Sequence, residues 1–174
     1  YPASSTASAY QFGAGNPGSP DAEYFLAENR QKSGFDAGLP GSGMLVWHIS
    51  ESTGNNDKEC YPGGPSCQTQ HYKVAVIQAD NKWSLEKKLS KGDAGDPFPG
   101  SANNTGLNDT TLPDSKLYSG YSSTLSISGI TVSQANIVAA MSYGAPAKVT
   151  LAYTKAGKGK GTVTFSPAGK MSSC

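Results

Sequence analysis

The sequence lacks three short motifs that commonly mark a metal, nucleophile or haem site. Zinc-dependent hydrolysis commonly uses two histidines one helical turn apart with a glutamate between them, and no His-Glu-x-x-His occurs. The serine elbow Gly-x-Ser-x-Gly and the Cys-x-x-Cys-His of haem attachment are absent as well. His48 and His71 lie far apart, so we expect structural roles for them; zinc ligation by both with a cysteine is the alternative. We therefore assign no catalytic residue.

Charge is sparse, and its two signs are mixed along the chain. Asp, Glu, Lys and Arg make up 16% of the residues and leave a net charge of +1. Lys and Arg therefore form no cluster dense enough to indicate a nucleic-acid-binding surface. No apolar run approaches the roughly 20 residues that a membrane-spanning helix needs. We expect neither nucleic acid nor a membrane span. Tyr1 follows no initiator Met or signal peptide, so we expect it to be an internal starting point.

The cysteines are few and odd in number. Cys60 and Cys67 bracket a short loop rich in Gly and Pro, which are turn formers able to bring two sulfurs together. A disulfide there would stabilise the fold by about 2–3 kcal/mol and would indicate a secreted or cell-surface protein. Two free thiols are the alternative. Cys174 is the last residue, so we expect its partner beyond the end of this chain.

Gly and Pro are abundant, whereas the residues that favour long helices are scarce. This composition is typical of short strands joined by many turns. Apolar patterns predict strands at residues 23–29, 44–49, 72–78 and 136–143. Residues 83–89 fit one or two helical turns.

The apolar alternation after residue 124 changes phase once. Leu125 and Ile127 alternate with polar neighbours, and Ile130 and Val132 continue one position out of phase. A single slip at Gly129 predicts a β-bulge or a bend between sheets.

The composition changes again near residue 145. The pattern of residues 149–165 indicates one hairpin, and an isolated hairpin is only marginally stable in water. We therefore expect residues 145–174 to be the start of a truncated second β module. Residues 1–144 are expected to form the main domain. We predict an all-β fold for it, of the β-sandwich or jelly-roll type.

Glu28 and Arg30 are two residues apart on one face of a predicted strand with apolar neighbours. Half-buried charges need partners. We expect both side chains to pin adjacent loops through hydrogen bonds to backbone carbonyls and amides, which is a structural role rather than a catalytic one.

The loop of residues 92–113 is the most suggestive polar segment. Calcium takes about six to eight oxygen ligands, which closely spaced Asp and Asn can supply. The spacing does not match an EF-hand, and Asp and Asn also cap turns. A calcium site and plain turn chemistry therefore both stay open. The candidate calcium ligands are Asp80, Asp93, Asp96, Asn104 and Asp109.

Three stretches, read together, resemble one family: residues 23–31 (EYFLAENRQ), 34–49 (GFDAGLPGSGMLVWHI) and 92–100 (GDAGDPFPG). They look like the immune inhibitor A family of secreted bacterial zinc metalloendopeptidases, with similarity over roughly residues 10–143. The zinc-binding helix of that family lies upstream of the matched region. The resemblance therefore implies a post-catalytic domain, with zinc held only in the absent catalytic domain.

The tail of residues 149–174 resembles the opening of a bacterial surface β-repeat, in which a Cys pair often follows a Ser-Pro-x-Gly turn. We expect a downstream repeat to supply the partner of Cys174. For the main domain we expect a non-catalytic accessory role, packed against the upstream catalytic domain of its own polypeptide. The alternative is a free-standing extracellular β-sandwich for binding or surface assembly, with aromatic segments around Tyr61 and at residues 118–121 as its contact surface.

Overall fold

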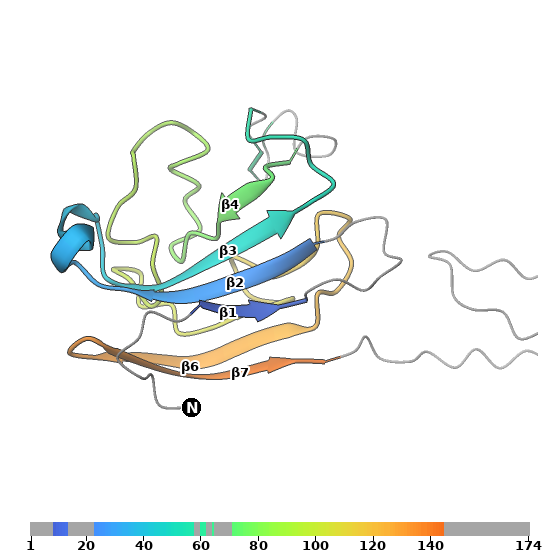
Figure 1. Cartoon of the computed structure of the whole chain (residues 1–174). Coiled ribbons are helices and arrows are strands. Elements are labelled where there is room, and N and C mark those ends of the chain that lie inside the picture. The colour runs from blue at the N-terminus through green and yellow to red at the C-terminus, as the bar shows by residue number, and fades with distance from the viewer. Residues whose placement is uncertain (1–8, 14–22, 58–59, 62–63, 65–70, 145–174) are drawn as a thin grey trace, which may run out of the picture.

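The computed structural model describes residues 9–13, 23–57, 60–61, 64 and 71–144, which form two antiparallel sheets (Figure 1). The first sheet has the order β1-β2-β3-β4 and the second has the order β5-β6-β7. The all-β prediction is confirmed, while the second module predicted for residues 145–174 lies outside the described residues. The elements are β1 (Ala9–Phe12), β2 (Glu23–Arg30), η1 (Gly34–Gly38), β3 (Gly43–Ser50), β4 (Val74–Val76), β5 (Leu107–Asn108), β6 (Leu125–Ser133) and β7 (Asn136–Tyr143).

The strands β2 and β3 each bury one face, because their side chains alternate between the core and the outside. Phe25 pairs with His48, and Ala27 pairs with Val46, and all four side chains are buried. Residues directly opposite each other in an antiparallel pair point to the same face. These four side chains therefore make the inner face of the first sheet.

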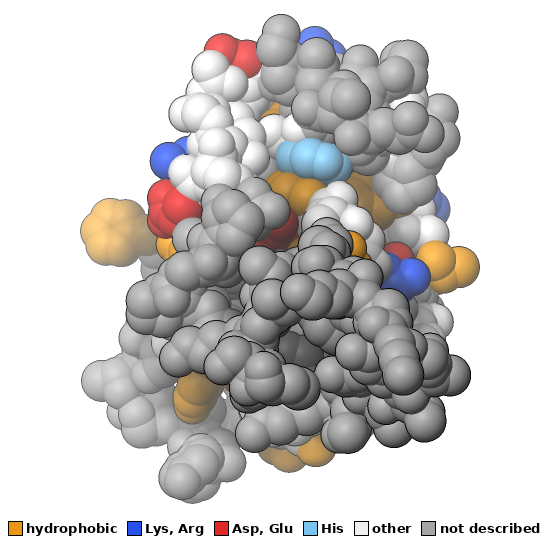
Figure 2. All heavy atoms as spheres, turned by 90° about the vertical axis from the view of Figure 1, so that its right-hand side faces the viewer, with side chains coloured by type: hydrophobic (Ala, Val, Ile, Leu, Met, Phe, Trp, Pro, Cys, Tyr) orange, Lys and Arg blue, Asp and Glu red, His pale blue; other side chains and the backbone are white. Residues whose placement is uncertain are grey.

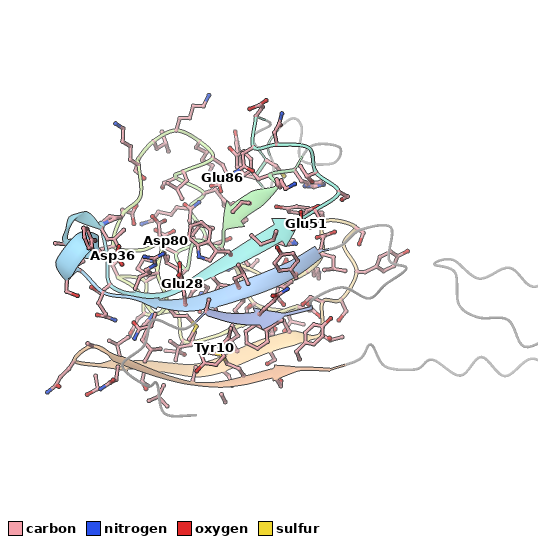
Figure 3. All side chains as sticks on the ribbon, viewed as in Figure 1. Tyr10, Glu28, Asp36, Glu51, Asp80 and Glu86 are labelled. Atoms are coloured by element: carbon pink, nitrogen blue, oxygen red, sulfur yellow. The ribbon has the colours of Figure 1, made fainter. Side chains whose placement is uncertain are left out.

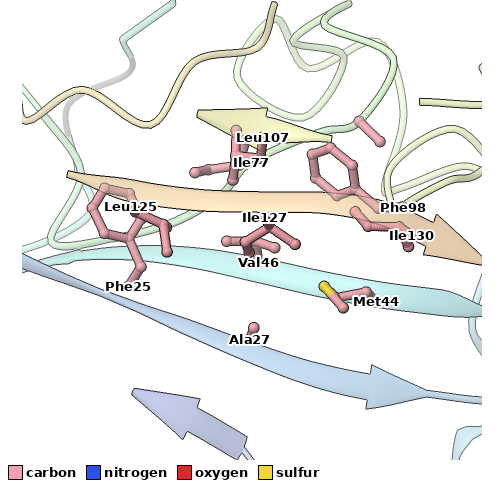
Figure 4. Packing of buried hydrophobic residues seen from close by; sticks show 11 residues of the cluster. Phe25, Ala27, Met44, Val46, Ile77, Phe98, Leu107, Leu125, Ile127 and Ile130 are labelled. Atoms are coloured by element: carbon pink, nitrogen blue, oxygen red, sulfur yellow. The ribbon is translucent and has the colours of Figure 1, made fainter. Parts of the chain in front are cut away.

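The strand β6 closes the core from the other side (Figure 4). Leu125, Ile127 and Ile130 are at most 1% exposed, and burying each contributes roughly 1.5–3 kcal/mol. The pairing of β6 with β7 shifts between Ser128 and Thr131, and Gly129 has a φ of +63°. The slip predicted at Gly129 is thus confirmed as a bulge, which returns Ile130 to the core.

The segment that follows residue 92 is tied to the first sheet, although the sequence predicted only a loop there. Met44 N donates to Phe98 O and Phe98 N donates to Met44 O, both at 2.8 Å. Phe98 is fully buried in the core between the sheets. The start of β3 therefore carries an additional backbone partner beside β2.

Two predicted elements are shorter than the sequence pattern suggested. The strand predicted for residues 72–78 spans only Val74–Val76. After Ile77 the backbone pairs with another segment, since Ala79 N donates to Asp96 O at 3.0 Å. Residues 83–89 form turns: Lys87 N donates to Trp83 O, but the positive φ of Trp83 and Lys88 ends the helical path. Among the described residues, no helix is long and apolar enough to cross a membrane.

The close approach of β3 to the Phe98 backbone requires a glycine at position 43. A Cβ on Gly43, whose φ is +153°, would lie 2.5 Å from Phe98 O. We predict that Gly43→Ala lowers the free energy of unfolding by about 3 kcal/mol. Gly38→Ala is the matched control, since a Cβ there meets nothing within 4 Å, and it should change stability by less than about 0.5 kcal/mol. Urea denaturation of both variants measures the difference; equal stabilities would contradict the prediction.

Candidate functional site

Four rings from different parts of the chain form one stack at the end of the sandwich where β3 finishes. The ring centroids of Phe25 and His48 are 4.5 Å apart, those of His48 and Tyr118 are 4.1 Å apart, and those of Tyr118 and His71 are 4.0 Å apart. Histidine atoms reach the surface at this end of the molecule, beside hydrophobic side chains (Figure 2). The stack joins β2 and β3 to the loop before β6 and to the segment before β4.

The carboxylate of Glu23 anchors this stack from inside. Its Oε2 accepts from His48 Nε2 at 2.6 Å and from Tyr118 N at 2.8 Å. The side chains of Glu23 and His48 are only 3% and 7% exposed. Because a carboxylate only accepts hydrogen bonds, both neighbours must supply protons. Glu23 therefore holds the loop before β6 against the first sheet.

Burial and the charge of Glu23 shift the pKa values of two rings of the stack, Tyr118 and His71. Burial raises the pKa of the Tyr118 phenol, and the negative charge of Glu23 raises it further. The Tyr118 hydroxyl donates to Tyr72 O at 3.0 Å. Burial lowers the pKa of His71, and the nearby Glu23 charge only partly opposes this. Both groups are therefore favoured in their neutral forms at neutral pH.

The two histidines do not share a ligand position. The Tyr118 ring lies between them, within about 4 Å of each, and Nε2 of His48 is already bonded to Glu23. Sγ of Cys60 lies 3.5 Å from His71 Nδ1. This geometry favours the structural interpretation of both histidines over shared zinc ligation.

The structure describes only one of the two cysteines of the predicted disulfide. Cys60 is disulfide-bonded, whereas Cys67 and Cys174 lie outside the described residues. The pairing of Cys60 with Cys67, and the downstream partner of Cys174, therefore stay predictions.

Glu28 and Arg30 share one face of β2, as predicted, and that face is the outer one; their partners are side chains. Trp47 Nε1 donates to Glu28 Oε1 at 2.9 Å, and Arg30 Nε lies 3.0 Å from the same oxygen. Arg30 Nη1 lies 2.9 Å from Oδ2 of Asp36 in η1. Side chains therefore form an ion-pair network between β2, β3 and η1 in place of the expected bonds to backbone groups, and Figure 3 labels Glu28 on β2 and Asp36 at η1.

Three of the five candidate calcium ligands surround Gly95. Asp93 Oδ1 accepts from Gly95 N at 2.7 Å, and Asp96 Oδ2 accepts from Asp93 N at 2.7 Å. Asp80 Oδ2 lies 3.0 Å from Lys82 Nζ, so the two side chains form an ion pair. Asp93 and Asp96 thus follow the turn chemistry that the sequence analysis left open.

The other two candidates lie in different contacts. The side-chain amide of Asn104 donates to Ala79 O at 2.9 Å. Oδ1 of Asp109 accepts from the hydroxyls of Ser115 and Ser123 at 3.0 and 3.1 Å. Burial pushes the pKa of Asp109 up, but hydrogen bonds from Ser122, Ser115 and Ser123 outweigh it and lower the pKa.

The five residues of the predicted calcium set do not share one set of contacts, and the calcium site itself stays a prediction. Asn104 bonds a backbone carbonyl and Asp109 a group of serines, while Asp80, Asp93 and Asp96 gather at Gly95. Across the residues that the structure describes, no group of three His, Cys, Asp or Glu side chains is arranged to hold a metal ion. The spacing of these residues in the sequence placed them in one loop, but the loop folds them into separate contacts.

The residue pattern did not predict the buried roles of Glu23 and Tyr118, because residues 118–121 were expected to form a contact surface. Glu23 stands in phase with Phe25 and Ala27, and His48 stands in phase with Val46, so period-two alternation alone points both polar side chains into the core. That signal could have paired Glu23 with His48. No comparable signal marks Tyr118, which reaches the pair from a loop.

Comparison of the chain with family models, curated proteins and solved structures gives no match. Functional inference therefore depends on the side chains described above and on the resemblance of the three stretches.

Loss of the Glu23 carboxylate should destabilise the fold strongly. Glu23→Ala leaves His48 Nε2 and Tyr118 N without their buried acceptor, so we predict a loss of about 3–5 kcal/mol of unfolding free energy. Glu51→Ala is the matched control, because its ion pair with Lys73 is at the surface, and it should cost less than about 1 kcal/mol. Chemical denaturation measures both; a Glu23→Ala variant as stable as Glu51→Ala would refute the buried anchor.

His71 should make stability depend on pH. Its folded-state pKa is lowered, chiefly by burial, so below about pH 6.5 the unfolded chain binds a proton that the folded chain does not. We therefore compare the unfolding free energy of the parent chain with that of His71→Gln. The parent chain's advantage should be complete above about pH 6.5 and should shrink on acidification. Burial raises the pKa values of Glu86 and Asp96, so these groups give the unfolding free energy the opposite pH dependence. Their contribution is the same in both proteins and cancels when the two free energies are subtracted. Denaturation curves across this pH range test it; a difference that grows in acid would contradict it.

Proposed function

We propose that this chain is a non-catalytic β-sandwich domain of a secreted bacterial zinc metalloendopeptidase, and that it packs against the catalytic domain upstream in its own polypeptide. The three stretches that carry the resemblance support this, since they form one structural unit. Residues 23–31 contain β2, and residues 34–49 contain η1 and nearly all of β3. Residues 92–100 pair with β3 through Met44 and Phe98. A resemblance confined to one contiguous unit is expected when a whole domain, and not scattered loops, is shared.

The observation that carries the docking role is the exposure of Phe35. This side chain lies in η1 and has a relative exposure of 110%. Burying a phenylalanine contributes roughly 1.5–3 kcal/mol, and this ring contributes nothing of that to the described core. Large aromatic side chains that remain exposed are typical anchors of protein interfaces.

The turn that presents Phe35 is held in place. Arg30 links the neighbouring Asp36 to Glu28, and Glu28 is in turn bonded to Trp47 on β3. Within η1, Leu39 N donates to Asp36 O at 3.0 Å. A pre-organised turn loses little conformational entropy when it binds. The ion-pair network therefore positions the ring for a partner rather than for this domain.

The alternative of a free-standing binding sandwich rests on exposed aromatic segments, and the geometry favours it less. The Tyr118 ring is stacked between two histidines, and Lys87 Nζ lies 5.2 Å from the Tyr61 ring centre. Tyr121, at 55% exposure, remains available for contact. These rings therefore do not make one continuous binding surface among the described residues.

Phe35→Ala tests the docking role. The variant should keep its thermal midpoint, because the ring makes no core contact. Its affinity for the separately produced catalytic domain should fall at least about tenfold, as expected for an interface anchor. Val138→Ala removes a side chain that is 66% exposed on β7 and should leave affinity unchanged.

Two calorimetric outcomes separate the parts of this proposal. Absence of binding between the parent chain and the catalytic domain would refute the accessory role. Tight binding that Phe35→Ala leaves unaltered would keep that role and refute Phe35 as its anchor.

A further inference from the structure

The strand β7 is the one long edge strand among the described residues. The two sheets end at β1, β4, β5 and β7. The first three of these strands contain four, three and two residues, whereas β7 contains eight. In an antiparallel sheet, every second residue of an edge strand points its N–H and C=O groups away from its neighbour. Since β6 is the only described strand that pairs with β7, its outer edge is a template for a further strand.

The edge of β7 has none of the usual protection against such pairing. Natural proteins protect an exposed edge with charged side chains, prolines or a bulge. β7 has the sequence NIVAAMSY, without a charged residue or a proline. The extra residue of the bulge lies in β6, between Ser128 and Thr131, and not in β7. Residues 117–147 contain no Asp, Glu, Lys or Arg at all, so no neighbouring segment brings a charge to this hairpin.

The inner face of β7 is apolar and only partly covered. Ile137, Ala139 and Met141 are half-buried against the core, and Tyr143 continues the same alternation with 49% exposure. Figure 1 shows β1 above β7, and a Cβ on Gly13, just after β1, would be 3.4 Å from the Tyr143 hydroxyl. A strand of four residues cannot cover one of eight. Further burial of these side chains would therefore stabilise whatever complex covers them.

The absence of charge favours a second copy of this chain over a different protein as the occupant. Two β7 strands related by a two-fold axis run antiparallel, and side chains near the axis meet their own copies. A charge near the axis would meet a like charge, which destabilises a cross-strand pair. An edge that selects a different protein can instead use complementary charges for specificity. The uncharged sequence of β7 is what pairing with itself requires.

We propose that two copies of this chain pair through their β7 strands and join their three-stranded sheets into one continuous sheet. Ala140 lies opposite its own copy at the two-fold axis, where a small side chain fits. Ile137 then lies opposite Tyr143 of the second copy, and Ala139 lies opposite Met141. Directly opposite residues point to the same face, so these apolar pairs all lie on the inner face. Both cores therefore lie on one side of the joined sheet.

The size of this contact fits a weak, reversible dimer. Two strands of eight residues exchange about eight main-chain hydrogen bonds, because every second residue contributes an N–H and a C=O. Typical protein interfaces contain about ten direct hydrogen bonds. Pairing along one strand, however, buries less than the roughly 800 Å² per partner of a standard interface. The dimer should therefore form at high protein concentration and dissociate on dilution.

Sedimentation equilibrium of the full chain from about 10 µM to about 500 µM measures this association. The parent chain should change from monomer towards dimer over the range. Ala140→Lys places two like charges at the axis and should raise the dimer dissociation constant at least about tenfold. Ser128→Lys is the matched control, since Ser128 is also exposed and pairs with Ala140 within the sheet but lies one strand away from the edge. This control should dimerise like the parent chain.

Three results would overturn the proposal. A parent chain that stays monomeric at the highest concentration would leave the edge to another segment of the chain or to a different protein. A dimer that Ala140→Lys does not weaken would exclude β7 as the interface. Equal weakening by Ala140→Lys and Ser128→Lys would show an effect of charge on the whole sheet face. Thermal midpoints of both variants should match the parent value, because both positions are exposed.

Disulfide cross-linking tests the same contact without an added charge, and so also decides if Ala140→Lys does not fold. Directly opposite residues of an antiparallel pair have Cα atoms about 4.5–5.5 Å apart, which a disulfide can span. Ala140→Cys should therefore form a covalent dimer on mild oxidation, whereas Ser128→Cys should not. Both variants carry Cys174→Ser, so that the last residue cannot cross-link. A dimeric Ala140→Cys chain that forms no cross-link would refute the pairing at Ala140.

Discussion

The buried carboxylate of Glu23 is the constraint on which the rest of this structure depends. A buried charge is tolerated only when its acceptor sites are filled, and Glu23 fills one oxygen with donors from two distant parts of the chain, His48 and Tyr118. This single atom therefore ties β2 and β3 to the loop that leads into β6. The ring stack from Phe25 to His71 then covers the anchor with aromatic surface and keeps water away from it.

Local apolar patterns account for how much of the fold the sequence could predict. They indicated β2, β3 and β7, and the phase change at Gly129 located the bulge in β6. They failed where contacts between distant segments decide the outcome. The pairing of Met44 with Phe98 has no local signature, and neither has the hydrogen bond from Ser84 N to the buried Gln78 side chain.

In the candidate site, too, local strand geometry was predictable and contacts between distant segments were not. Strand geometry placed Glu28 and Arg30 on one face of a strand correctly, but their actual partners, Asp36 and Trp47, depend on how η1 and β3 fold back. The acidic loop is the opposite case, since its composition suggested a cation and the folded chain places the Lys82 ammonium beside Asp80 instead. A charged side chain from the same segment can serve where an ion was expected, and composition does not distinguish the two.

Position in the fold also separates side chains that stabilise from side chains that remain free to act. Glu23 and Asp96 are both buried carboxyl groups, yet Glu23 has two donors on one oxygen, whereas Asp96 leaves Oδ1 without any among the described residues. Phe98 and Phe35 differ in the same way, because one ring fills the core and the other is wholly exposed on a pinned turn. The core does not depend on a contact from Asp96 Oδ1 or from the Phe35 ring. These two groups are therefore where chemistry and binding can be added without loss of the fold.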